Sequence, residues 1–284
     1  MSSAGDLKKR MSNISSVEQL IHAMDMVAST KLVGARRTLE GIRPMYTELK
    51  NTVEELGHHE ENSDHKYFKQ RPVKNSLYIV FSSDKGLAGS YNSNILNKAL
   101  DHMNEQDTNE QIVVIGSVGH EFFKKNKKNI IKPYYNVSSE DVYYGAQSIA
   151  EDANELFQDG EVDEIFLVYT DFENMLKMNP HIERLLPLEI DTTHGFDDAV
   201  EYEPTIDVFI EHVVPLYLHM SIFGAFAEAD ASEQASRSIS MDAASENAEE
   251  LLEDLESEYN RERQAAITEE LNEIVSSAQA MDNI

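Results

Sequence analysis

Apolar residues recur at every third or fourth position from the start of the chain, which places them on one face of a helix. We expect this helix to run from residue 7 to about residue 56. Pro44 predicts a kink or a join near Arg43, because proline disfavours helical geometry in the residue before it. The apolar positions that define the face are Leu7, Met11, Ile14, Val17, Ile21, Met24 and Ala28.

The periodicity is lost over residues 57–72, a polar stretch that we interpret as a linker. The stretch holds three histidines and three acidic residues, a composition that metal sites share. Their spacing fits no standard metal motif, so a solvated loop is favoured and a metal site is the alternative. These residues are His58, His59 and His65 with Glu60, Glu61 and Asp64.

Between residue 73 and about residue 200 the pattern changes to short apolar runs, typical of buried strands, that alternate with helical patterns. We predict strands at 76–83, 111–117 and 164–170, and helices at 94–103, 119–126 and 140–157. Strands that alternate with helices favour a largely parallel sheet. The predicted fold class is therefore α/β, with a Rossmann-like domain.

A third segment starts near Pro204 and runs through Pro215 into a helix that lacks any glycine beyond Gly224, over about 60 residues. Small residues occupy many apolar positions at first, and larger ones return near the end. Because neither terminal helix can cover its apolar face alone, we expect them to pair as an antiparallel coiled coil. At 1.5 Å per residue the second helix spans about 90 Å, so its tip needs a cover from outside the chain.

These patterns divide the chain into four parts. We expect an N-terminal coiled-coil helix over 1–57, a linker over 58–75, an α/β domain over 76–203 and a C-terminal coiled-coil helix over 204–284.

The formal net charge of −28 argues against partners that are themselves anionic, so we expect no binding of nucleic acid. No run approaches the about 18 to 20 uncharged apolar residues of a membrane span, and the N-terminus has no apolar signal core. The chain has no cysteine, which excludes disulfides. We expect a cytosolic protein without a membrane span.

Residues 82–92, SSDKGLAGSYN, follow a predicted strand and open a helix, where α/β folds bind phosphate. The stretch lacks the ending of a P-loop, so a structural turn is favoured over an anion site. A basic cluster is interpreted as a solvated helix end. No catalytic motif is recognisable, so we predict no enzyme activity, no metal and no cofactor. The cluster consists of Lys124, Lys125, Lys127 and Lys128.

Five stretches together resemble the gamma subunit of F-type ATP synthases, of the bacterial, Firmicute-like branch, and the resemblance covers essentially the whole chain. The last of them is long and highly specific. They are HAMDMVASTKL (22–32), SDKGLAGSYNSN (83–94), RLLPL (184–188), EYEP (201–204) and the helical stretch 231–280.

The resemblance implies a central rotor shaft that is not itself catalytic. Its coiled coil would turn inside the hexamer of alpha and beta subunits, driven by flow of H⁺ or Na⁺ through the ring of c subunits. The α/β domain would face epsilon and the c-ring, with delta as a further candidate partner. The protein would lie peripherally on the cytoplasmic face of the plasma membrane.

The resemblance also assigns site residues. Arg263 and Gln264 match the pair that hydrogen-bonds a catch loop of the beta subunit, and Thr268 closes their motif. Packing and bearing positions of the shaft, and foot residues near the c-ring and epsilon, follow in the same way. The packing and bearing positions are Met24, Lys31, Leu271 and Val275, and the foot residues are Tyr202 and Glu203.

Some positions depart from the family pattern. Val33 and Gly34 stand where basic residues are common, and Gly34 costs the helix about 1 kcal/mol relative to alanine. From the residues alone, two other classes stay open. One is a nucleotide-binding α/β enzyme with helical arms, and the other is a static coiled-coil scaffold.

Overall fold

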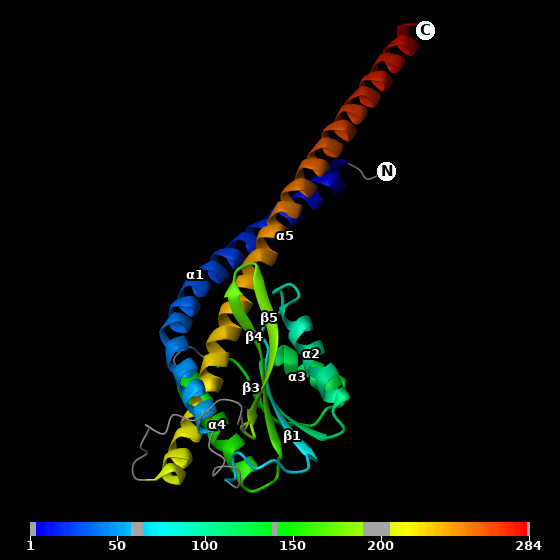
Figure 1. The fold of residues 1–284 in the computed structure, drawn as a ribbon. Helices are drawn as coiled ribbons and strands as arrows, with labels where there is room; N and C mark the ends of the chain where they lie inside the picture. Colours follow the sequence, from blue (N-terminus) through cyan, green and yellow to red (C-terminus); the bar gives the residue numbers. More distant parts are fainter. Residues whose placement is uncertain (1–3, 58–64, 138–140, 190–204, 283–284) are drawn as a thin grey trace. The chain divides into compact units, whose positions relative to one another are not determined.

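The computed structural model describes residues 4–57, 65–137, 141–189 and 205–282 of the 284-residue chain (Figure 1). The chain forms two compact units, Met1–Ala28 with Ser238–Ile284, and Ser29–Arg237. Two long helices, α1 (Ala4–Leu56) and α5 (Ile206–Asp282), contribute residues to both units. The predicted four-part division stays a prediction.

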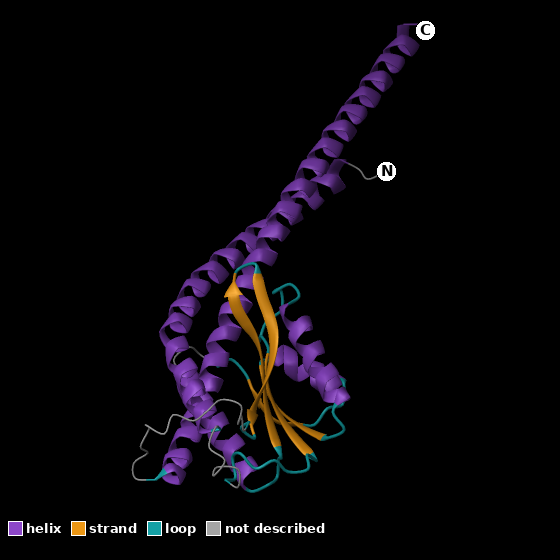
Figure 2. Ribbon diagram, viewed as in Figure 1, coloured by secondary structure: helices purple, strands orange, loops and turns teal. Residues whose placement is uncertain are grey.

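The larger unit holds a sheet with the strand order β3-β2-β1-β4-β5 (Figure 2). β1, β2, β3 and β4 pair in parallel, and β5 pairs with β4 in antiparallel fashion. The strands are β1 (Asn75–Phe81), β2 (Asn109–Ile115), β3 (Ile130–Tyr134), β4 (Glu164–Asn174) and β5 (Lys177–Leu186).

Both faces of this sheet are covered, which explains why its central strands read as continuous apolar runs. Along β1, Leu77 and Ile79 belong to the core shared with α4, α5 and the end of α1, whereas Tyr78 and Val80 belong to the core shared with α2 and α3. Figure 1 shows α2 and α3 on one side of the sheet. The helices between strands are α2 (Tyr91–Glu105), α3 (Ser117–Lys125) and α4 (Val142–Gln158).

The α/β fold class is confirmed, and the predicted strands and helices of this region correspond to β1, β2, β4, α2, α3 and α4. The pattern did not reveal β3 or β5. Pro44 does not end the first helix, since α1 continues through it to Leu56.

The described part of the predicted linker packs on the core. Tyr67 and Phe68 are fully buried, and the Tyr67 hydroxyl donates a hydrogen bond to Asn154 Oδ1 at 2.8 Å. His65 stacks against Tyr67 with ring centroids 5.5 Å apart. No group of three potential metal ligands occurs among the described residues. The other members of the histidine and acid set, His58, His59, Glu60, Glu61 and Asp64, lie outside the described residues.

One stretch of α5 is long and apolar enough to cross a membrane by length and composition alone, with a mean hydropathy of 1.4. In this fold, 61% of that stretch is buried, and its apolar residues Ile210, Val214, Leu218 and Ile222 belong to the core on the sheet. The burial is that of a core helix.

Candidate functional site

The smaller unit pairs the start of α1 with the second half of α5, and the two stretches run side by side in opposite directions (Figure 1). Leu7 and Leu255 are buried, and the Ser238 hydroxyl donates to Asp25 Oδ1 at 2.7 Å. Met24, predicted as a packing residue, is half-buried in this unit. Helix pairing here combines buried apolar residues with a polar link.

Beyond the paired stretch, α5 exposes large apolar side chains at helical spacing. We call these the tip stripe, and its positions are four, three and one residues apart, so they share one face. A row of exposed large apolar side chains on one helix face indicates a surface that a partner covers. The residues and their exposed fractions are Ile267 (47%), Leu271 (56%), Ile274 (59%) and Val275 (53%).

Arg263 and Gln264 lie just before the tip stripe, and both are exposed. In the described part of the chain, neither side chain has a hydrogen-bond or ion-pair partner. Thr268 differs, because its hydroxyl donates to the carbonyl oxygen of Gln264 at 2.9 Å and so closes on its own helix. The structure therefore brings these three predicted residues together with Leu271 and Val275 on one length of α5.

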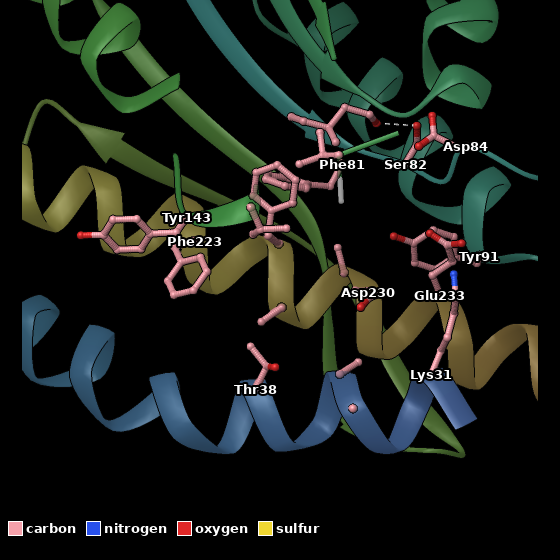
Figure 3. Close-up of a pocket in the computed structure, with 18 residues that line it drawn as sticks. Lys31, Thr38, Phe81, Ser82, Asp84, Tyr91, Tyr143, Phe223, Asp230 and Glu233 are labelled. Carbon is pink, nitrogen blue, oxygen red and sulfur yellow. Dashed lines mark hydrogen bonds between the residues drawn. The ribbon is translucent and has the colours of Figure 1, made fainter. Parts of the chain in front are cut away.

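Lys31 lies in the larger unit, away from these residues in the chain. It lines a cavity of about 650 Å³ that is bounded by α1, α5 and the ends of β1 and β2 (Figure 3). Figure 3 shows Lys31 and Thr38 on α1, with Asp230 and Glu233 on α5. Burial raises the pKa of Asp230, and the charges of Lys31 and Arg237 act in the opposite direction.

The turn at 82–92 is occupied by contacts within the protein. The Asn92 side chain accepts from the Ser83 backbone N–H at 3.0 Å and donates to the Ser83 hydroxyl at 2.7 Å. From α5, Ser236 donates to the Ala88 carbonyl oxygen at 2.8 Å, and Arg237 donates to the Lys85 carbonyl oxygen at 3.2 Å. These bonds fit the structural turn, which they attach to α5.

The helix start next to this turn already has an anion. Asp84 accepts hydrogen bonds from the backbone N–H groups of Ser117, the first residue of α3, at 3.0 Å and of Asn136 at 2.7 Å. A carboxylate at a helix N-terminus takes the place that a bound phosphate would use. The helix that the turn itself opens is α2 and not α3, so the anion site at the turn stays the alternative to a structural turn.

Comparisons with known proteins identify the family. A family model described as ATP synthase matches residues 3–281. The ATP synthase gamma chain of Alkaliphilus metalliredigens is 33% identical to this chain, over 97% of this chain and 98% of its own length. The chain belongs to the ATP synthase gamma chain family. The gamma chain of Staphylococcus carnosus is 35% identical over 99% of this chain and 100% of its own.

Solved structures have the same fold. A chain of the Euglena gracilis mitochondrial ATP synthase, in a structure of OSCP, F1 and c-ring, aligns with a TM-score of 0.70 at 17% identity, covering 98% of this chain and 94% of that one. A chain from the central stalk and c-ring of the Tetrahymena thermophila enzyme aligns with a TM-score of 0.59 at 24% identity, covering 80% and 99%. The resemblance to the gamma family is confirmed.

Of the other predicted positions, Tyr202 and Glu203 lie outside the described residues. The lysine cluster of this gamma chain is largely solvated, at the end of α3 and just after it. Only Lys128 is substantially covered there, where its Nζ lies 3.2 Å from a carboxylate oxygen of Glu110.

Sequence reasoning missed a polar cluster around Glu228 of α5, which we call the Glu228 cluster. Glu228 is 1% exposed, and its Oε1 accepts from the guanidinium of Arg43 at 2.8 and 3.1 Å and from the Tyr46 hydroxyl at 3.1 Å. Its Oε2 accepts from the backbone N–H of Phe172 at 2.9 Å. One carboxylate thus joins α1, α5 and the β4–β5 hairpin of the gamma chain.

The signal that could have revealed this cluster is weak. Glu228 stands among alanines and a phenylalanine in the sequence AFAEADA. Burying an unpaired charge there would be costly, so a paired one is expected. Its partners come from positions more than 50 residues away in the chain, and no local pattern names them.

Proposed function

We propose that this gamma chain is the central rotor shaft of a bacterial F-type ATP synthase. In this role, ion flow through the c-ring turns the chain, and the turning shaft couples that flow to ATP synthesis or hydrolysis at the beta subunits. The chain would carry out no catalysis itself and need no cofactor. Family membership supports the role, and the single observation that carries it is the exposed tip stripe.

The tip stripe gives the proposal its physical basis. Burying one large aliphatic side chain yields about 1.5–3 kcal/mol, so four half-exposed residues at 267, 271, 274 and 275 leave considerable free energy for a partner. A hexamer of alpha and beta subunits around the tip would supply the missing cover. Because its contacts with the shaft would differ among three beta subunits, each orientation would favour a different set of beta conformations.

The polar contacts of the tip fit the same role. The last 60 residues hold about sixteen acidic side chains and only three arginines, so a cation is a distinctive feature there. The side-chain donors of Arg263 and Gln264 have no partner among the described residues, and a guanidinium makes directional bonds to carboxylate and carbonyl oxygens. We propose that this pair binds a loop of the beta subunit. Thr268 would support the pair through its bond to the Gln264 carbonyl oxygen.

The remaining assignments extend the proposal to the rest of the complex. The unit Ser29–Arg237 would face epsilon and the c-ring, with delta as a further candidate partner. Tyr202 and Glu203 stay predicted contacts on that side. The protein would bind peripherally, through these subunits, to the cytoplasmic face of the membrane.

Reconstitution with alpha and beta subunits tests the proposal. We expect ATPase turnover of the hexamer to depend on this chain, and a bead attached to the larger unit to rotate when ATP is added. A static scaffold would restore assembly without rotation, and that result would refute the rotor role. Saturable binding of labelled ATP to the isolated chain would favour a nucleotide-binding enzyme instead.

A further inference from the structure

The cavity beside Lys31 has the position and size of a ligand site, and the proposed rotor role does not use it. It lies within the unit Ser29–Arg237, at the carboxyl ends of β1 and β2, where Phe81, Ser82 and Ile115 line it (Figure 3). The cavity therefore lies at the carboxyl edge of two neighbouring parallel strands. Its volume falls within the range of small-molecule pockets, about 300–1,000 Å³.

The charges that line the cavity favour a cation. They are three carboxylates, Asp84, Asp230 and Glu233, and one ammonium group, Lys31. Two of the carboxylates are already satisfied, since Asp84 accepts two backbone N–H groups and Glu233 lies 2.7 Å from the guanidinium of Arg237. Asp230 is the third carboxylate, and among the described residues the charges of Lys31 and Arg237 act on it only from beyond ion-pair distance.

Asp230 accepts one hydrogen bond, from the Gln234 side-chain amide at 3.1 Å. Among the residues that the structure describes, no lysine, arginine or histidine nitrogen lies within 4.0 Å of its carboxylate. Burial raises the pKa of Asp230, which is the direction expected for a carboxylate without a close cation. A cation bound at this place would pair with Asp230 and reverse the shift.

Tyr91 supplies a second and independent indication. It lines the cavity, is only 5% exposed, and its hydroxyl has no hydrogen-bond partner in the described part of the chain. A ligand in the cavity can therefore hydrogen-bond this hydroxyl without displacing a protein partner. Burial raises the pKa of Tyr91, so the hydroxyl stays neutral and can accept a hydrogen bond from an ammonium group.

The rest of the lining is aromatic and aliphatic. Phe81 and Phe226 meet edge to face with ring centroids 4.7 Å apart, and Tyr143 and Phe223 do so at 5.6 Å. Such walls suit an organic body better than a hydrated metal ion, and aromatic faces attract cations. No set of three metal-ligating side chains occurs in the described residues, here or elsewhere.

We propose that this cavity binds an organic cation, a primary or secondary amine on an apolar body. The ammonium group lies between the Asp230 carboxylate and the Tyr91 hydroxyl. The apolar body lies against Phe81, Phe223 and Phe226.

The test uses the full-length chain and two probes of equal shape. 4-(Aminomethyl)biphenyl carries the ammonium group, and 4-(hydroxymethyl)biphenyl is its neutral counterpart. We expect the amine to bind at least tenfold more tightly in calorimetric titration. In Asp230→Asn the two probes should bind equally, whereas the exposed Asp101→Asn control on α2 should keep the preference. Equal binding of both probes to the wild type, or binding of neither, would overturn the proposal.

Two glycines of α1 give a matched test of location. A Cβ atom at Gly34 would meet nothing within 4 Å, and Gly34 lines the cavity. Gly41, on the same helix, is equally open but is not part of the lining. Gly34→Leu should reduce amine binding at least tenfold, and Gly41→Leu should leave it unchanged. Unchanged amine binding in Gly34→Leu would place the bound amine outside this cavity and refute the assignment. Both readouts are binding to the isolated chain, so they are independent of rotation.

Discussion

Removal of the Glu228 carboxylate is the sharpest test of how the larger unit is held together. Glu228→Ala deletes the acceptor for Arg43, Tyr46 and the backbone N–H of Phe172 in a single step. Arg43 and Tyr46 belong to α1 and Phe172 belongs to β4, whereas Glu228 belongs to α5. We therefore expect the β4–β5 hairpin to be the first element to loosen.

The magnitude follows from how each partner is exposed. The N–H of Phe172 is buried, and leaving it without an acceptor costs about 1–3 kcal/mol. Arg43 is 43% exposed and can be solvated by water after the change, so its lost pairing adds only about 1 kcal/mol. The total, about 3 kcal/mol, is at the lower end of the range for breaking a buried ion pair, about 3–5 kcal/mol.

Amide hydrogen exchange on β4, measured by mass spectrometry, reports this change locally. A loss of about 3 kcal/mol corresponds to roughly hundredfold faster exchange at β4. Glu173→Ala is the control, because Glu173 follows Phe172 in β4, is exposed, and among the described residues pairs with Lys177 on the surface. Such a pair contributes about 0–1 kcal/mol. If exchange in Glu228→Ala stays within the range of Glu173→Ala, the Glu228 cluster does not stabilise the hairpin.

Three further predictions concern the tip and the pH response. Arg263→Ala with Gln264→Ala should weaken assembly or coupling of ATPase turnover to rotation in the reconstituted hexamer, and wild-type coupling would count against the catch-loop assignment. Leu271→Ala with Val275→Ala should leave the urea midpoint of the isolated chain nearly unchanged, within about 0.5 kcal/mol, yet reduce affinity for the hexamer; equal affinity would refute the covered tip. Burial, with a nearby carboxylate, raises the pKa of Tyr46 from 10 to about 12. Its contribution to stability is therefore complete below pH 10 and is lost as the pH rises toward 12, so Tyr46→Phe should unfold in urea with a shallower pH dependence over that interval.

The central strands and both long helices could be predicted because their signals are local. β1, β2 and β4 each contain a continuous apolar run that is buried on both faces, LYIVF, IVVI and IFLVY. The long helices were predicted from periodic apolar positions and, beyond Gly224, from the absence of glycine and proline. Local pattern was enough wherever an apolar run or an apolar period continues along an element.

The elements at the sheet edges could not be predicted, because their burial is partial. β3 (IIKPY) has a proline and a lysine and shows no buried residue along its length. In β5, burial changes from exposed to buried along the strand, and only Leu185 and Leu186 are fully covered. The candidate sites also differ in how far the local sequence reveals them. Arg263 and Gln264 were predicted from a long family motif, whereas Tyr91 and Asp230 come to line one cavity only when the chain folds.

The residues of α5 change in size along the helix, and its polar links lie where the residues are smallest. Near Ile222 large apolar side chains pack on the sheet, but around Ala231 the helix packs through alanines against Leu32 and Leu39 of α1. Alanine buries little surface, so the hydrophobic gain per residue is low there. Glu228 and the residues of α5 that bind the 82–92 turn lie in this same stretch. The helices thus approach closely where the hydrophobic gain is low. Larger side chains would stabilise this stretch only by separating the helices, so hydrogen bonds hold the helices in register instead.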